Sequence, residues 1–162
     1  MSSYHFMTAC EGDIPEIVSI YHRLIGTPGC TWDLNYPTID TAHSDVSAKS
    51  LFILRDDRQI IAVASTEPAD DLAHLEWLPK RPCQLARIGV IPPMQNSGIG
   101  TFILKEVMTT ARHRGHDGII MLVSKTNPAA LALYESNGFT RCGEAFMYDV
   151  DFYCYQITFH TD

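Results

Sequence analysis

The stretch Val90-Ile91-Pro92-Pro93-Met94-Gln95-Asn96-Ser97-Gly98-Ile99-Gly100 decides the fold, because it joins a strand to a helix through a glycine-bearing turn. The apolar run 84–91 predicts a strand, and the two prolines end it because proline cannot continue a ladder. Apolar residues then recur at helical spacing from Ile99 toward Gly115. Backbone N–H groups at a helix start lie at the positive end of the dipole, and glycine lets phosphate oxygens come close. The turn 95–100 therefore predicts a diphosphate site.

The glycine spacing in this turn differs from two common nucleotide fingerprints. It matches neither G-x-G-x-x-G nor G-x-x-x-x-G-K-[ST], and no phosphate-binding lysine follows, which argues against a nucleotide hydrolase. Glycines at helix starts are also common where nothing binds, so the turn alone leaves a purely structural role open. A second element, about thirty residues further along the chain, decides between the two interpretations.

That second element is a short strand followed by a capped helix. The continuous apolar run 118–123 predicts a strand buried on both faces. Asn127 beside Pro128 is typical of an N-cap followed by the favoured first-turn proline, and Gly138 fits the left-handed position after a helix over 128–137. Tyr134 follows Asn127 by two helical turns, or ~10 Å, on nearly the same face.

The remaining chain predicts a mixed sheet in one domain, residues 1–162. Asp13 is interpreted as an N-cap with Glu16 as its capping-box partner. The order β-α-α-β-β-β-α-β-α-β-β contains two strand–helix–strand passages that predict locally parallel pairing, whereas the ends are expected to be antiparallel. Further expected elements are a strand 4–9, a helix 39–48, a hairpin of 51–54 with 59–65, an irregular connection 68–82, and closing strands 141–149 and 152–159.

Composition excludes several classes of partner. The 162 residues carry a net charge of −7 without a Lys/Arg run, which argues against nucleic acid, and an acidic surface either steers a cationic amine or only maintains solubility. Five scattered cysteines and seven histidines show no ligand spacing, so we expect neither a disulfide framework nor a metal site. No signal peptide or membrane-length apolar run is visible, so we expect a cytoplasmic protein without membrane contact.

Two motifs carry a resemblance to a known family. Gln95-x-x-Gly98-x-Gly100 after Val90-x-Pro92 resembles motif A of the GNAT acetyltransferases, which holds the coenzyme A pyrophosphate. Asn127-x-x-Ala130-x-x-x-Tyr134-x-x-x-Gly138-Phe139 resembles their motif B. The resemblance runs from about residue 6 to 159, and its specific part is 85–143. Gln95 stands where many relatives carry arginine, and Asn96 and Ser97 where a basic residue and glycine are frequent, which implies modest affinity for coenzyme A.

The resemblance implies an α/β (mixed α+β) GNAT fold. Its central sheet is mixed, mostly antiparallel and of about seven strands, with about four helices on both faces. Acetyl-CoA would be the co-substrate, and homodimers are common among relatives. Gly89 would suit the bulge that frees backbone groups for the pantetheine arm, or it is a glycine kept for packing. The cofactor-binding residues implied are Ile88, Gly89, Val90, Gln95, Asn96, Ser97, Gly98, Ile99, Gly100, Thr101, Asn127, Ala130 and Tyr134.

The resemblance also implies catalytic roles. Tyr134 would protonate the departing thiolate, although a core tyrosine is the alternative. An attacking amine must lose a proton, and the candidate bases are His74, Glu76 or a water. A backbone N–H of the central strand, at Val90, would stabilise the oxyanion. Trp32 and Tyr36 would bind the acceptor, or would only cover the core.

The function expected is transfer of an acetyl group from acetyl-CoA to a primary amine of a small molecule or peptide. No Cys–His pairing is evident, so direct attack is favoured over a covalent enzyme intermediate. Two alternatives stay open: a catalytically silent acyl-CoA sensor or interaction module, and a transferase with another acyl donor or an alcohol acceptor. The sequence leaves the acceptor, the general base, the acyl-chain preference and the oligomeric state open.

Overall fold

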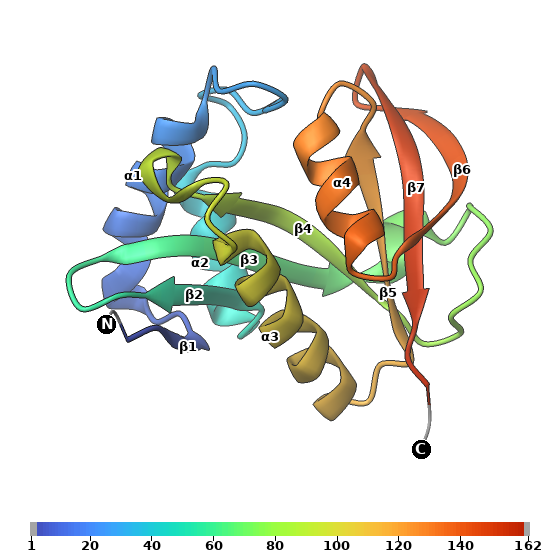
Figure 1. The fold of residues 1–162 in the computed structure, drawn as a ribbon, viewed down its shortest axis with the longest axis horizontal. Coiled ribbons are helices and arrows are strands. Elements are labelled where there is room, and N and C mark those ends of the chain that lie inside the picture. The colour runs from blue at the N-terminus through green and yellow to red at the C-terminus, as the bar shows by residue number, and fades with distance from the viewer. Residues whose placement is uncertain (1–2, 161–162) are drawn as a thin grey trace. The chain divides into compact units, whose positions relative to one another are not determined.

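The computed structural model describes residues 3–160 and contains seven strands, four α-helices and three short 3₁₀-helices (Figure 1). The strands are β1 His5–Thr8, β2 Leu51–Arg55, β3 Ile60–Pro68, β4 Cys83–Val90, β5 Gly118–Ser124, β6 Thr140–Met147 and β7 Val150–Thr158. The helices are η1 Glu11–Asp13, α1 Ile14–Leu24, α2 Ile39–Ser47, η2 Ala69–Leu72, η3 Pro92–Met94, α3 Ile99–His113 and α4 Pro128–Ser136.

The strands follow the order β1-β2-β3-β4-β5-β7-β6 in one sheet. β1 with β2, β2 with β3, β5 with β7, and β6 with β7 pair antiparallel. β4 pairs parallel with β5, as expected for strands joined through a helix. The mixed, mostly antiparallel sheet with four helices is the fold class that the sequence predicted, and that prediction is confirmed.

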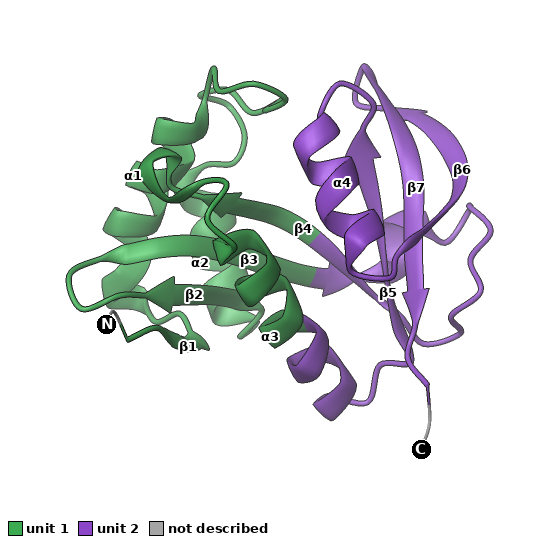
Figure 2. Ribbon diagram, viewed as in Figure 1, with its two compact units in different colours: residues 1–66, 86–107 green, residues 67–85, 108–162 purple. Residues whose placement is uncertain are grey.

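Backbone contacts divide the chain into two compact units (Figure 2). Unit 1 comprises residues 1–66 and 86–107, and unit 2 comprises residues 67–85 and 108–162. Both β4 and α3 contribute residues to each unit. A single domain over residues 1–162 stays a prediction.

Unit 1 is built around β2 and β3, whose apolar residues are almost completely buried. The amphipathic helix α1 turns one face inward, and α1 contacts α2. In Figure 1, α2 lies behind the sheet of this unit and the first turns of α3 lie in front of it. The inward face of α1 consists of Ile14, Ile17, Ile20, Tyr21 and Leu24.

The start of α1 differs from the capping box predicted at Asp13. Asp13 already has helical dihedrals as the last residue of η1, and its side chain makes no cap hydrogen bond to α1. Its carboxylate instead accepts a hydrogen bond from the Cys10 N–H (2.9 Å) and pairs with Arg55 (3.1 Å). Glu16 accepts from the Ile60 N–H (2.6 Å), so both carboxylates have tertiary partners and the local prediction was wrong.

Unit 2 is built around β5, which is buried along nearly its whole length as its apolar run predicted. The prediction of parallel pairing for the second strand–helix–strand passage was wrong, because β7 lies between β5 and β6. β6 and β7 form a hairpin across the two-residue turn Tyr148–Asp149, in which both residues have positive φ (54° and 59°). These two residues end β6 earlier than the sequence predicted.

The α4 caps are those that the sequence predicted. The Asn127 side chain accepts a hydrogen bond from the Ala130 N–H (3.2 Å), and Pro128 opens the helix. Gly138 has φ 91°. The Gly138 N–H donates to the Glu135 carbonyl (3.3 Å) and the Phe139 N–H to the Tyr134 carbonyl (3.1 Å), which is a Schellman motif.

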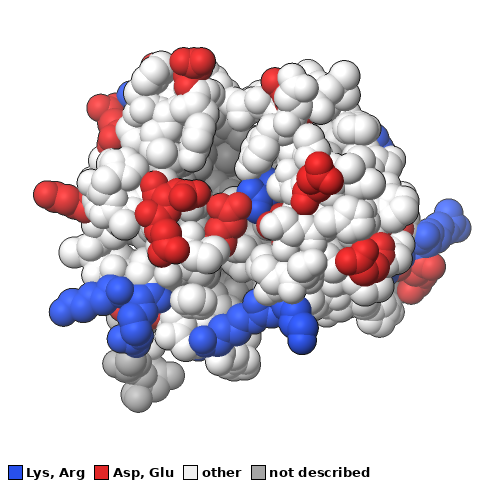
Figure 3. All heavy atoms as spheres, turned by 180° about the vertical axis from the view of Figure 1, so that it is seen from behind, with Lys and Arg blue, Asp and Glu red and all other residues white. Residues whose placement is uncertain are grey.

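The surface charge agrees with the acidic composition. On the face shown in Figure 3, acidic and basic side chains form small groups, some of which adjoin each other, and no continuous basic stripe crosses it. Among residues 3–160, no helix combines the length and hydropathy that crossing a membrane requires.

Candidate functional site

The predicted diphosphate turn is an exposed connection in unit 1. η3 follows β4 directly, and residues 95–98 lead from it into α3, all four of them exposed. Asn96 (φ 60°) and Gly98 (φ 87°) are both left-handed. The turn is held from within, because the Gln95 Nε2 donates to the Val90 carbonyl (3.0 Å) and the Ser97 hydroxyl donates to the Met94 carbonyl.

The start of α3 is suited to an anion. The first intrahelical bond runs from the Phe102 N–H to the Gly98 carbonyl (3.0 Å). The N–H groups of the residues before Phe102 therefore have no acceptor in the helix and point outward at the positive end of its dipole. The first turn of α3 contains no acidic residue. A ligand with a diphosphate, such as coenzyme A, fits these groups and the open space above Gly98, where an added Cβ would meet nothing within 4 Å.

The residue of β4 with a positive φ is Arg87, whereas the resemblance implied a bulge at Gly89. Arg87 has φ 50°, in the left-handed region. Gly89 has no positive φ, but a Cβ there would lie 2.4 Å from the Leu24 Cδ1 and 3.5 Å from the Trp32 ring. These contacts agree with a glycine kept for packing, and a cofactor-binding role for Gly89 stays a prediction. Ile88 and Val90 flank it, partly buried at the end of the strand.

Trp32 and Tyr36 both lie in the α1–α2 loop (residues 25–38) but differ in surroundings. The Trp32 ring is partly buried edge-on against Tyr21 (5.6 Å between centroids). Tyr36 is 48% exposed, and its hydroxyl accepts a hydrogen bond from the Arg87 Nη1 (2.7 Å). Trp32 therefore contributes to the packing of unit 1, whereas nearly half of Tyr36 is exposed, and an acceptor-binding role for either residue stays a prediction.

A buried ion pair in unit 1 was missed by the sequence analysis. Arg87 donates from Nη2 to both carboxylate oxygens of Asp45 (2.9 Å each) and from Nε to Oδ2 (3.1 Å). Ser65 also donates to Asp45 Oδ2 (3.0 Å). The available signal was an arginine inside the apolar run 84–91, since a charge in a buried strand needs a partner.

Tyr134, the predicted acid, lies on α4 in unit 2. Its side chain is 4% exposed, and its ring packs edge-on against Phe139 (5.6 Å). Burial raises the pKa of its hydroxyl above the usual value, so the phenol stays protonated at neutral pH. A protonated, fixed phenol can donate a hydrogen bond or a proton, and Asn127 and Ala130 lie at the start of the same helix.

The two candidate bases, His74 and Glu76, are exposed residues of the connection between η2 and β4 in unit 2. Their role stays a prediction. Among residues 3–160, no three His, Cys, Asp or Glu side chains lie together in a way that would hold a metal ion.

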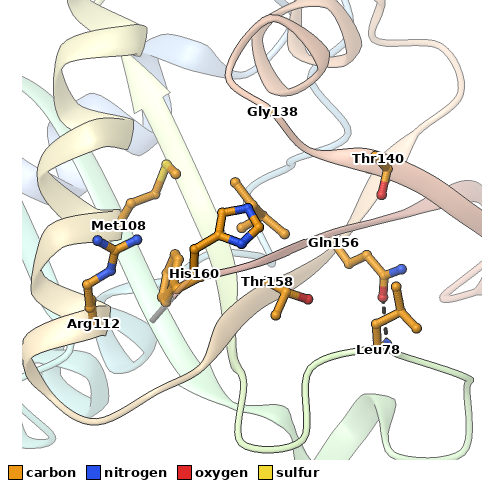
Figure 4. A pocket seen from close by; sticks show the side chains of 10 residues that line it. Leu78, Met108, Arg112, Gly138, Thr140, Gln156, Thr158 and His160 are labelled. Carbon is orange, nitrogen blue, oxygen red and sulfur yellow. Dashed lines mark hydrogen bonds between the residues drawn. The ribbon is translucent and has the colours of Figure 1, made fainter. Parts of the chain in front are cut away.

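Unit 2 also contains a cavity of about 370 Å³ that includes none of the predicted site residues. Figure 4 shows Met108 and Arg112 extending from α3 toward the strand that carries Gln156 and Thr158. The Gln156 Oε1 accepts from the Leu78 N–H (2.8 Å), and the Arg112 guanidinium lies 5.0 Å from the Phe159 ring centroid. The lining consists of Leu78, Met108, Arg112, Gly138, Thr140, Gln156, Ile157, Thr158, Phe159 and His160.

Solved structures with the same fold are acetyltransferases. The ribosomal-protein-S18-alanine N-acetyltransferase of Escherichia coli superposes with a TM-score of 0.76 at 22% identity, covering 99% of this chain and 96% of that one. YncA of Salmonella typhimurium, a putative acetyltransferase solved with its cofactor acetyl-CoA, superposes with a TM-score of 0.79 at 17% identity, covering 99% and 96%. At these identities the likeness shows the fold alone.

Similar sequences are N-acetyltransferases. N-alpha-acetyltransferase RimI of Mycobacterium tuberculosis is 40% identical over 73 residues, which is 44% of this chain and 44% of that protein. N-acetyltransferase 8 of mouse is 23% identical over 109 residues, covering 67% of this chain and 46% of the mouse protein. The chain thus spans less than half the length of these relatives.

The match to a family model is broader. The model of the acetyltransferase (GNAT) family matches residues 17–139, from within α1 to the residue after the α4 Schellman glycine. Since this match covers most of the chain, the protein belongs to the GNAT family of acetyltransferases.

Proposed function

We propose that this acyltransferase moves an acetyl group from acetyl-CoA to a primary amine of a small molecule or peptide by direct attack. The observation that carries the proposal is the exposed turn 95–98 with its two left-handed residues, which opens α3 without an acidic residue. Bound acetyl-CoA would supply the acetyl group as a thioester. Cofactor binding, proton donation to the sulfur and stabilisation of the oxyanion are assigned to residues of this chain, and the base is a side chain or a water.

The cofactor would be held mainly by backbone groups. The N–H groups of Ile99, Gly100 and Thr101 would bind the diphosphate at the helix start. Gln95 brings no positive charge to this site, and its amide is engaged by the Val90 carbonyl. We therefore expect affinity for coenzyme A to depend on backbone geometry more than on ion pairs. The pantetheine arm is assigned to the backbone of residues 88–90 and to Asn127 and Ala130.

Tyr134 is assigned the proton donation to the departing sulfur. Burial keeps its hydroxyl protonated, and edge-on packing against Phe139 limits the movement of the ring. The packing keeps the ring in place when the thiolate forms, whereas the raised pKa makes the phenol a weaker acid than a free tyrosine, so the assigned role depends on its position rather than on its acidity. His74, Glu76 or a water would accept the proton of the amine, and the Val90 N–H would stabilise the oxyanion.

The state of the cysteines supports direct attack. Burial raises the pKa of Cys83 to about 11 and also raises the pKa of Cys154, and partial desolvation raises the pKa of Cys142, an exposed residue, to about 11. Thiols with raised pKa values are poor nucleophiles at neutral pH. An acyl-cysteine step is therefore disfavoured at these three positions.

The similar proteins support a first choice of acceptors for assays. RimI of M. tuberculosis is an N-alpha-acetyltransferase by name, and the E. coli structure is that of a ribosomal-protein-alanine N-acetyltransferase. Peptide N-termini should therefore be tested beside small alkylamines and amino acids.

The test combines titration calorimetry with coenzyme A and an assay of free coenzyme A release across the amine panel. We expect wild-type protein to bind coenzyme A and to release it from acetyl-CoA in the presence of an accepted amine. Tyr134→Phe should keep binding and lower kcat roughly 10²-fold, since general acid catalysis contributes about that much. Tyr148→Phe, a change of the same size at a 74% exposed tyrosine, should have no effect.

Three outcomes would contradict parts of the proposal. Absence of binding heat would remove the cofactor site. Binding without release for any amine would instead favour the acyl-CoA sensor. Unchanged kcat at saturating substrates in Tyr134→Phe would remove that residue from the acid role.

A further inference from the structure

Stability alone does not explain the buried ion pair between Arg87 and Asp45. The two residues are 8% and 6% exposed, and three hydrogen bonds join them. Removing two charges from water costs about as much as their attraction returns, so apolar residues would stabilise this place at least as well. A buried pair of this kind is better explained by the positions of the residues that it fixes than by a gain in stability.

Arg87 fixes geometry first in its own strand. Its φ of 50° is uncommon for a residue with a side chain and persists only where the surroundings determine it. The surroundings here are the carboxylate of Asp45 on α2, which Ser65 on β3 orients in turn. The guanidinium is thereby locked at the middle of β4, three residues before Val90.

The remaining nitrogen of the guanidinium reaches the α1–α2 loop. Nη1 donates to the Tyr36 hydroxyl at 2.7 Å, and the Arg87 Cζ lies 5.9 Å from the Tyr36 ring centroid. Tyr36 is held in the loop by two backbone hydrogen bonds with Asp33 (3.0 and 3.2 Å). One end of the Tyr36 side chain is thus tied to β4 while nearly half of it faces solvent.

We propose that Arg87 is a positioning residue for the acceptor site. Its guanidinium holds the Tyr36 ring, and with it the α1–α2 loop, in the arrangement that binds the amine. The inference rests on the proposed function, because it takes this loop as the place of the acceptor. The charges agree with a cationic acceptor, since Asp45 neutralises the guanidinium that would otherwise repel an ammonium group. Arginine is required here because lysine, a point charge, cannot bind the carboxylate through two nitrogens and reach Tyr36 with a third.

The decisive variant is Tyr36→Phe, which removes the hydroxyl and leaves the ring and the ion pair in place. Arg87→Lys is the second variant, and Tyr148→Phe is the matched control at an exposed tyrosine of unit 2. Two readouts are needed. The first is amide hydrogen exchange of residues 25–38 in the free protein. The second is steady-state kinetics, in which kcat, KM for the acceptor and KM for acetyl-CoA are each determined.

We expect Tyr36→Phe to speed exchange of the loop amides and to raise the acceptor KM, each by about tenfold, because a hydrogen bond to a charged group is lost. KM for acetyl-CoA should not change, and Tyr148→Phe should alter neither readout. Arg87→Lys should likewise speed exchange of the loop amides and raise the acceptor KM.

Unchanged exchange in Tyr36→Phe would overturn the claim that Arg87 holds the loop. Faster exchange with an unchanged acceptor KM would overturn the positioning role and leave the acetyltransferase standing. A wild-type protein that accepts no amine would contradict the proposed function itself.

Discussion

Glycines 98 and 89 stand close together in the sequence but are required for different reasons. Gly98 has a left-handed φ of 87° and open space around its Cβ position. Gly89 has no positive φ, and an added Cβ would lie 2.4 Å from the Leu24 Cδ1, so a side chain there would require Leu24 to shift. The sequence predicted a role for both positions from local patterns, but the approach of α1 to β4 is a tertiary contact that no local pattern encodes.

The different environments lead to a matched prediction at Gly98. Gly98→Ala should cost about 1 kcal/mol in the free energy of unfolding, because alanine resists a left-handed conformation. Gly115→Ala should cost the same, since Gly115 has φ 92° and equally open space. Only Gly98→Ala should weaken coenzyme A binding, by roughly tenfold or more, because only that turn is assigned to the diphosphate. Urea denaturation and titration calorimetry on both variants measure the two effects, and equal coenzyme A affinities would argue against the turn.

Arg87 has a buried partner that the sequence does not identify. An arginine inside an apolar strand demands a buried partner, but the sequence offers 19 acidic residues and no way to choose among them. Asp45 becomes the partner because α2 turns it inward, on the same side as Ala42 and Val46. The left-handed turn 95–98 and the α4 caps depend on residues next to each other in the chain, so their backbone geometry was predictable.

At the scale of elements, the error in the sheet order has a local cause. The passage from β5 through α4 to β6 has the length and pattern of a parallel crossover, and the sequence predicted one. β7 nevertheless pairs with both β5 and β6, because the tight turn Tyr148–Asp149 brings it back antiparallel beside β6. The residues in that turn, tyrosine and aspartate, lack the Asn-Gly signature that announces such a hairpin.

That unfavourable turn predicts a stabilising substitution. Both turn residues have positive φ, as in a type I′ turn, where Asn-Gly is the preferred pair. Tyr148→Asn combined with Asp149→Gly should therefore raise the free energy of unfolding by about 1 kcal/mol, since the strain of left-handed residues is relieved. Tyr148→Phe is the control and should change nothing, because phenylalanine resists positive φ as tyrosine does. A double variant no more stable than wild type in urea denaturation would show that this turn is not strained.

At the scale of the whole molecule, acidic groups outnumber basic ones, and several carboxylates hold backbone groups in place. Asp117 in unit 2 accepts hydrogen bonds from the N–H groups of Lys80 (2.8 Å) and Arg81 (2.7 Å). Partial burial acts to raise the pKa of Asp117, but these two N–H groups lower it, and the net shift is downward. In unit 1, Asp13 has a lowered pKa for the same balance of burial against hydrogen bonds from Cys10 and Arg55.

The direction of these shifts fixes how stability depends on pH. A carboxyl whose pKa is lower in the folded state contributes its full stabilisation above the unfolded pKa of about 3.9, and loses it as pH falls through the folded value. Asp117→Asn should thus cost about 1 kcal/mol at pH 7, through the weakened hydrogen bonds to Lys80 and Arg81. The difference from wild type should shrink as pH falls below about 4, because Asp117 is protonated first in the unfolded state and only at lower pH in the folded protein. Urea denaturation at about pH 7 and pH 3 measures both values.

Asp57→Asn, which removes the same charge from an exposed turn, should stay within about 0.5 kcal/mol of wild type at both pH values. A difference for Asp117→Asn that stayed constant between the two pH values would mean that its hydrogen bonds do not depend on the carboxylate charge.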